Sequence, residues 1–185
     1  MAEKILARAS GRAGLSAGEA VWAKLDVVAL TDGGEPVYDW IDRHGLKVWS
    51  PGKVLFCFDH FYDAAARYPA AAVHAAIRAF ARRQGIPGEN LYDVGRHGIS
   101  HQVPAEAGRV LPGMFCGTRD TQGATLGALN CFALPLRGTT ACAVVTGDVW
   151  MVVPESTRIT LRGALPRGVL GKDIYFRLMK DFKEG

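Results

Sequence analysis

The segment Lys53-Val54-Leu55-Phe56-Cys57-Phe58 is largely apolar and ends abruptly in the pair Asp59-His60. A short run rich in aromatic and β-branched residues predicts a buried strand. Polar residues at the tip of such a strand face the crevice in which an open α/β sheet binds ligands. An aspartate beside a histidine can fix the tautomer of the imidazole and raise its basicity. The junction therefore predicts a chemical site, and the alternative is an ordinary surface turn.

Segments with strand character alternate with segments with helix character, which predicts an α/β fold of layered α/β/α architecture. We expect one or two strands within residues 19–31 and further strands over residues 53–58, 90–94, 110–116 and 157–161. We expect helices over residues 2–12, 36–41, 64–84, 140–150 and 172–182, with His74 as a packing residue of the third. No repeat or linker interrupts the 185 residues, so we expect a single domain over residues 1–185.

The distribution of charged residues limits the kinds of partner that we expect the chain to bind. The formal net charge is +4, but Lys and Arg are scattered and no basic run is interleaved with aromatic residues. We therefore expect no nucleic-acid binding, while attraction for small carboxylates or phosphates fits the basic balance. The N-terminus lacks the apolar stretch of a signal peptide, and no segment is long enough to span a membrane. A cytoplasmic protein without membrane contact is the expectation.

The four cysteines, Cys57, Cys116, Cys131 and Cys142, are widely spaced and include no CxxC pair. This spacing favours free, mostly buried thiols in a reducing compartment. A zinc or iron–sulfur site would require the fold to gather them.

Three polar clusters follow predicted strands: Asp59-His60, His97 with His101, and residues 118–122. Together they offer acid/base groups, orienting carboxylates and, in Arg119, a bidentate clamp for a carboxylate. A mononuclear metal on Asp59, His60 and one further imidazole is an alternative that we do not favour. His97 and His101 also have the spacing that binds metal on a helix, but Gly98 argues against a helix there. The alternative, non-functional interpretation of Arg119-Asp120 is an ion pair on the surface that stabilises the loop.

The order of these clusters resembles the first domain of the aconitase and isopropylmalate dehydratase family, nearly end to end. The matching segments are Ala2–Gly11, Lys47–Val54, Phe58–Phe61, Leu91–Gly95, Gly98–Val103, Leu111–Gly113, Gly117-Thr118, Gly127–Leu129, Gly138–Thr140 and Gly171–Ile174.

The resemblance implies a chemistry and a set of site residues. Family members remove water from a 2-hydroxy di- or tricarboxylate and add it back, with a [4Fe–4S] cluster binding the departing hydroxyl. By resemblance, Asp59 and His60 match a pair that helps to protonate that hydroxyl, and His101 matches a second catalytic histidine. We expect the substrate-binding residues to be Thr31, Asp32, Thr118, Arg119 and Asp120, with Arg119 a donor where the family has an acid.

The departures from the family are also informative. The family's Asp-Ser-His-Thr element is replaced by Arg119-Asp120-Thr121-Gln122-Gly123, and its usual Gln or His before Asp32 is Thr31. The family's three cluster cysteines lie beyond the last residue of this sequence. The resemblance therefore implies no cluster in this chain, and we expect no cofactor and no metal.

We favour a cluster-free descendant that acts on a small di- or tricarboxylate by acid/base proton transfer, giving isomerisation or dehydration. His60 oriented by Asp59 and His101 would exchange protons, and Arg119 with Thr118 would hold a carboxylate. Two alternatives stay open: a subunit of a split hydratase whose partner brings the cysteines, and a non-catalytic carboxylate-binding protein. In each case we expect the former domain interface to be covered by a homodimer or a partner subunit.

Overall fold

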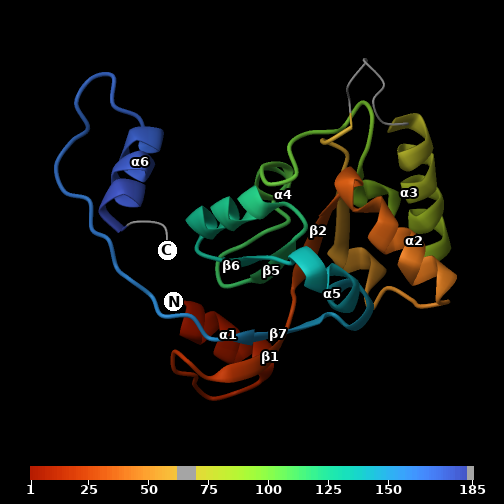
Figure 1. Cartoon of the computed structure of the whole chain (residues 1–185), viewed down its shortest axis with the longest axis horizontal. Helices are drawn as coiled ribbons and strands as arrows, with labels where there is room; N and C mark the ends of the chain where they lie inside the picture. Colours follow the sequence, from red (N-terminus) through yellow and green to blue (C-terminus); the bar gives the residue numbers. More distant parts are fainter. Residues whose placement is uncertain (62–69, 183–185) are drawn as a thin grey trace.

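A five-stranded parallel sheet forms the centre of the computed structural model, which describes residues 1–61 and 70–182. The strand order is β4-β3-β2-β5-β6 (Figure 1). The strands are β2 (Val27–Thr31), β3 (Val54–Cys57), β4 (Leu91–Tyr92), β5 (Phe115–Thr118) and β6 (Phe132–Pro135).

Helices cover both faces of the sheet, which confirms the layered α/β/α prediction. The central strands β2 and β3 are buried along their whole length, as expected when both faces of a parallel sheet are covered. One face forms the main core with α2 (Glu35–Arg43), α3 (Ala70–Gln84) and α5 (Thr140–Thr146). The other packs against α4 (Val103–Glu106) and the 3₁₀ helix η4 (Thr121–Leu129).

The strand order creates a switch point beside β2. From β2 the chain passes to β3 and β4 on one side of the sheet, and then crosses to β5 and β6 on the other. The connections that follow β2 and β5 therefore diverge at the carboxyl edge, which is where open α/β sheets bind ligands. The remaining 3₁₀ segments are η1 (Asp32–Gly34), η2 (Pro51–Lys53), η3 (Gly88–Asn90) and η5 (Arg137–Thr139).

A second, two-stranded sheet lies at the base of the fold. It pairs β1 (Ala20–Lys24) with β7 (Asp148–Val152) in antiparallel register, next to α1 (Ala2–Ser10). Trp22 and Trp150 are cross-strand partners, and both are exposed. An extended segment leads from β7 to α6 (Gly171–Phe182), which stands apart from the main sheet (Figure 1). None of the helices within the described ranges is long and apolar enough to cross a membrane.

Several predicted elements are confirmed and others need correction. Residues 19–31 form two strands, and the helices expected near residues 2–12, 36–41 and 172–182 are present. The helix expected over 140–150 is wrong beyond Thr146: Gly147 ends it with a φ of 76°, and the following residues form β7. A left-handed glycine is a common helix terminator, and the apolar residues after it pair with β1.

Two strand predictions are also wrong in part or in whole. The strand expected over 110–116 lies at Phe115–Thr118, because Gly113 turns with a φ of 82° just before it. Residues 157–161 form no strand and are exposed, and no strand in the described part of the chain pairs with them. Strand β6 was not predicted. The start of the helix expected over 64–84 lies outside the described residues, and α3 is described from Ala70.

Candidate active site

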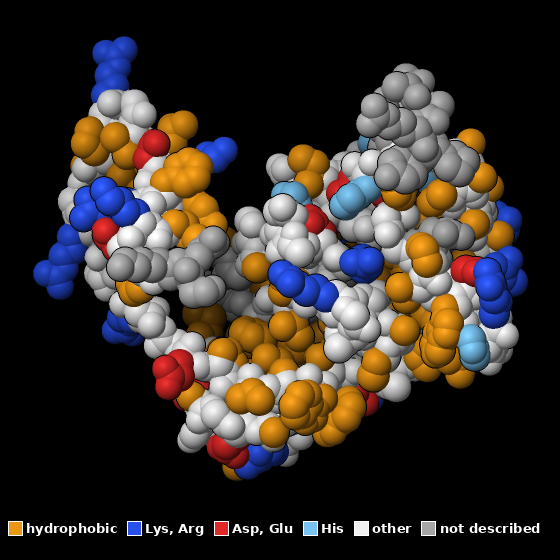
Figure 2. All heavy atoms as spheres, in the orientation of Figure 1, with side chains coloured by type: hydrophobic (Ala, Val, Ile, Leu, Met, Phe, Trp, Pro, Cys, Tyr) orange, Lys and Arg blue, Asp and Glu red, His pale blue; other side chains and the backbone are white. Residues whose placement is uncertain are grey.

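Polar residues follow the carboxyl ends of three adjacent strands. Asp32 follows β2, Asp59 and His60 follow β3, and Arg119 with Asp120 follows β5. Because parallel strands end at the same edge, residues far apart in sequence meet there. Figure 2 shows histidine, acidic and basic side chains gathered around a hollow in this part of the surface.

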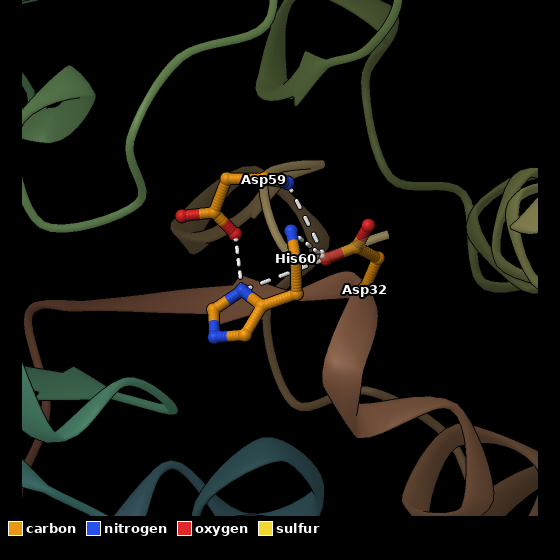
Figure 3. Close-up of side chains that lie close together, drawn as sticks. All are labelled: Asp32, Asp59 and His60. Atoms are coloured by element: carbon orange, nitrogen blue, oxygen red, sulfur yellow. Dashed lines mark hydrogen bonds and ion pairs between the residues drawn. The ribbon is translucent and has the colours of Figure 1, made fainter. Parts of the chain in front are cut away.

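Asp59 and His60 form the first of two acid–imidazole pairs. Nδ1 of His60 lies 2.6 Å from Oδ1 of Asp59, and the side chain of His60 is 44% exposed. An ionised carboxylate only accepts hydrogen bonds, so Nδ1 carries the proton and Nε2 is left for an outside partner. Figure 3 shows the imidazole turned with Nδ1 toward the two aspartates. The pair can therefore donate or accept a proton at Nε2.

His101 and Asp120 form the second pair, with the same nitrogen-to-oxygen distance. Nδ1 of His101 lies 2.6 Å from Oδ2 of Asp120. Ser100 lies between the two pairs: its backbone N–H donates to Asp59 Oδ2 at 2.6 Å, and its hydroxyl contacts Asp120 Oδ2 at 3.3 Å. The fold thus brings the two pairs together around one serine, which sequence reasoning did not identify.

The Asp120 carboxyl is held in its charged form. Partial burial alone would raise its pKa, but the hydrogen bond from His101 and that from the Gln122 backbone N–H outweigh burial, so the pKa lies below its ordinary value. The charge of His60 also acts on Asp120, which places the two acid–imidazole pairs within electrostatic range of each other.

Asp32 plays a different part from the other carboxylates at this edge. It is fully buried, and it accepts backbone hydrogen bonds from Asp59, His60 and Phe61 at 3.3, 2.9 and 3.1 Å. His74 of α3 contacts its second oxygen at 2.9 Å. The sequence placed Asp32 among the substrate-binding residues, but this burial favours a role in holding the turn. His74 does pack as expected, and it also makes this polar contact.

Arg119 contributes a positively charged guanidinium group to the site. Its backbone N–H continues the sheet by donating to Ala29 at 2.8 Å. Among the described residues its side-chain Nε is buried without a hydrogen-bond partner. Its positive charge acts on the buried Tyr38, whose hydroxyl donates to the Thr31 carbonyl at the end of β2. A buried guanidinium nitrogen without a partner suits a ligand that supplies an acceptor oxygen.

Thr31 and Thr118, two further predicted site residues, lie at the same edge of the sheet, but their side chains are less accessible to a ligand. Thr31 is buried at the end of β2. Thr118 is also buried, and its hydroxyl donates to the Asp120 carbonyl at 2.8 Å, supporting the loop that carries Arg119 and Asp120. His97 is exposed and lies in the loop before Ser100.

An apolar pocket adjoins His101. Its volume is about 340 Å³, and it lies between α4 and η4. The lining residues are His101, Gln102, Ala105, Thr125, Leu126, Ala128 and Leu129. The pocket therefore places an apolar wall directly beside one of the two imidazoles.

The four cysteines of this chain do not fit an iron–sulfur cluster. Cys57, Cys116 and Cys131 are buried and Cys142 is exposed on α5. Burial raises the pKa of Cys57 to about 12, which disfavours the thiolate that a metal requires. Within residues 1–61 and 70–182, no three thiols converge as ligands.

One group at the site does have metal-ligand spacing. Asp32, Asp59 and His60 each bring an atom within 4.8 Å of the others. However, backbone N–H groups and His74 already point at the Asp32 oxygens. This donor arrangement favours an anchored carboxylate over a cation site.

Fold and site together define an α/β domain with paired acid–imidazole groups at the carboxyl edge of a parallel sheet. Residues 21–185 match the model of the aconitase family (aconitate hydratase). The chain belongs to the aconitase family.

Curated relatives support this membership. A 3-isopropylmalate dehydratase large subunit of Methanopyrus kandleri is 40% identical over 181 residues, covering 96% of this chain and 42% of the relative. A probable methanogen homoaconitase large subunit of Methanothermobacter thermautotrophicus is 36% identical over 187 residues, covering 97% and 42% respectively. The chain thus spans about two fifths of the length of these relatives.

Proposed function

We propose that this chain acts on a small di- or tricarboxylate by acid/base proton transfer, giving dehydration or isomerisation of the substrate. The observation that carries the proposal is the pair of imidazoles, each bound through Nδ1 to a carboxylate at 2.6 Å. Both leave Nε2 for chemistry, and at the same edge of the sheet Arg119 has a buried Nε that lacks a hydrogen-bond partner among the described residues.

The proposed steps use only residues of this chain. Arg119 binds a substrate carboxylate and offsets the negative charge that develops when the adjacent carbon loses its proton. One imidazole Nε2 accepts that proton, and the other, protonated, donates its proton to the departing hydroxyl, so that water and an alkene result. For isomerisation, a proton returns to a different carbon instead. Asp59 and Asp120 stabilise the imidazolium forms in turn.

The apolar pocket beside His101 bears on the choice of substrate. Two relatives are named for substrates of different character, isopropylmalate and the homoaconitase substrate. A pocket lined by Ala105, Leu126 and Leu129 suits an aliphatic substituent rather than a third carboxylate. We therefore propose a branched 2-hydroxy dicarboxylate such as 3-isopropylmalate as the first compound to test.

The test is proton exchange into the substrate. The purified chain is incubated with 3-isopropylmalate in D₂O. ¹H NMR then follows the hydrogen on the carbon that bears the isopropyl group, next to a carboxylate. Exchange that is lost in His60→Ala and in His101→Ala, both folded by circular dichroism, would support the proposal. Exchange that persists in both variants, or that is absent from the wild-type chain, would reject proton transfer by this chain alone.

A second candidate is a subunit that works with another polypeptide. The relatives are named as large subunits, and this chain spans about two fifths of their length. The exposed Trp22 and Trp150 on β1 and β7 also agree with a face that a partner covers. Co-purification with a cysteine-bearing protein and an iron absorption band in the complex would favour this candidate over the first.

A further inference from the structure

The turn that carries His60 depends on a carboxylate from the neighbouring strand. Asp32 follows β2, whereas residues 59–61 follow β3, so no local sequence rule joins them. Oδ1 of Asp32 accepts the N–H groups of Asp59 and His60, and Oδ2 accepts the N–H of Phe61. Three successive backbone donors thus point at one buried carboxylate, which fixes the path of the turn and the direction in which the His60 side chain leaves it.

A buried carboxylate needs its hydrogen bonds completed, and His74 completes those of Asp32. The Nε2 atom of His74 lies 2.9 Å from Oδ2, and the side chains of the two residues are 7% and 0% exposed. The imidazole of His74 stacks on Phe58 with centroids 4.8 Å apart and an interplanar angle of 10°. The ring is therefore held in orientation by the residue directly before Asp59.

We propose that His74 is a positioning residue that acts through Asp32 to hold the 59–61 turn and so aims His60. The side chain of His74 itself is only 7% exposed. Its packing against Phe58 alone would be satisfied by any flat ring, whereas its contact with Asp32 requires a donor at the Nε2 position. These two functions of one side chain can be separated by substitution.

Three variants separate them. His74→Phe keeps a flat ring for Phe58 but has no donor. His74→Gln carries an amide N–H₂ at about the reach of Nε2, and His74→Asn carries a shorter amide that does not reach Asp32. Each variant is studied in the full 185-residue chain.

The readout is the set of backbone amides that face Asp32. In ¹⁵N–¹H spectra we expect His74→Phe and His74→Asn to shift the Asp59, His60 and Phe61 amides upfield and to speed their hydrogen exchange at least tenfold. His74→Gln should restore the wild-type values. The Leu30 amide, inside β2, is the internal reference, and its exchange should change no more than global stability requires. If His74→Phe fails to fold, the comparison of His74→Asn with His74→Gln still tests whether a donor to Asp32 is needed.

Two results would overturn the proposal. In the first, the amide shifts and exchange rates of residues 59–61 stay unchanged in a folded His74→Phe or His74→Asn variant. In the second, His74→Gln shows the same altered shifts and exchange rates as those variants. The catalytic consequence rests on the proposed proton transfer, for which we expect a lower turnover number with little change in KM in His74→Phe. Because the amide readout needs no substrate, an inactive wild-type chain would reject the proposed function and still leave the positioning claim decided by the spectra.

Discussion

Nδ1 of His101 lies 2.6 Å from a carboxylate oxygen of Asp120, although the two residues belong to loops that follow different strands. The same distance separates His60 from Asp59, its neighbour in sequence. The site thus contains one pair that is visible in the sequence and a second that is assembled by the fold.

Replacing His60 should abolish proton exchange into the substrate. Loss of a positioned acid/base group reduces a rate by about 10²–10⁴-fold, and we expect His60→Ala to fall in that range. Because the side chain is 44% exposed, stability should change little. Exchange measured by NMR and the urea unfolding midpoint check the two parts. His44→Ala, which alters an exposed histidine at the end of α2, is the control and should retain full exchange.

The carboxylates should set the tautomers of their histidines. In the wild-type chain, ¹⁵N NMR of neutral His60 and His101 should show the proton on Nδ1. In Asp59→Asn the His60 ring should become a mixture of tautomers, because an amide can donate as well as accept, while His101 keeps its tautomer. Asp120→Asn should give the opposite pattern. Unchanged tautomers in both variants would contradict the assigned geometry.

Asp120 should make stability depend on acid pH. Its folded pKa is lowered from an unfolded value near 3.9, so its contribution is complete above the unfolded pKa. That contribution is lost as the pH falls through the folded pKa. We therefore expect wild-type protein to lose more unfolding free energy between about pH 5 and pH 2 than Asp120→Asn does. Urea titrations at a series of pH values measure this difference, and parallel curves for the two proteins would reject it.

Arg119 should dominate carboxylate affinity. A hydrogen bond to a charged group contributes about 1.5–3 kcal/mol, so Arg119→Leu should weaken dicarboxylate binding by roughly 10-fold or more. Arg119→Lys should recover only part of the affinity, because lysine cannot bind a carboxylate through two parallel N–H groups. Calorimetric titration measures binding. Arg158→Ala, at an exposed position on the segment before α6, should bind as wild type.

Gly147 should be less replaceable than Gly45, although both adopt a left-handed backbone, with φ of 76° and 63°. A Cβ at Gly45 meets open space, so Gly45→Ala should cost about 1–2 kcal/mol from backbone strain alone. A Cβ at Gly147 would lie 2.5 Å from the Trp49 ring, and overpacking adds about 1–3 kcal/mol. Chemical unfolding of the two variants measures the difference. Equal losses would contradict the close approach to Trp49.

Local patterns were sufficient for much of the fold. The apolar run before Asp59 predicted β3 because burial on both faces requires it, and the alanine-rich segment through Gln84 predicted α3 where it is described. Local patterns were insufficient where the pairing of one strand with another determines the secondary structure. Residues 148–152 form a strand because they pair with β1, whereas residues 157–161, which were also predicted as a strand, have no pairing strand among the described residues and form none.

By itself, the sequence determined the alternation of strands and helices, the family resemblance and the Asp59-His60 pair, because these depend on residue type and spacing along the chain. Only the tertiary structure decided that Asp120 pairs with His101, that Ser100 lies between the two pairs, and that Asp32 accepts the N–H groups of residues 59–61 and contacts His74. These contacts span 19 to 42 residues. They exist because parallel strands end at one edge, where loops distant in sequence become neighbours in space.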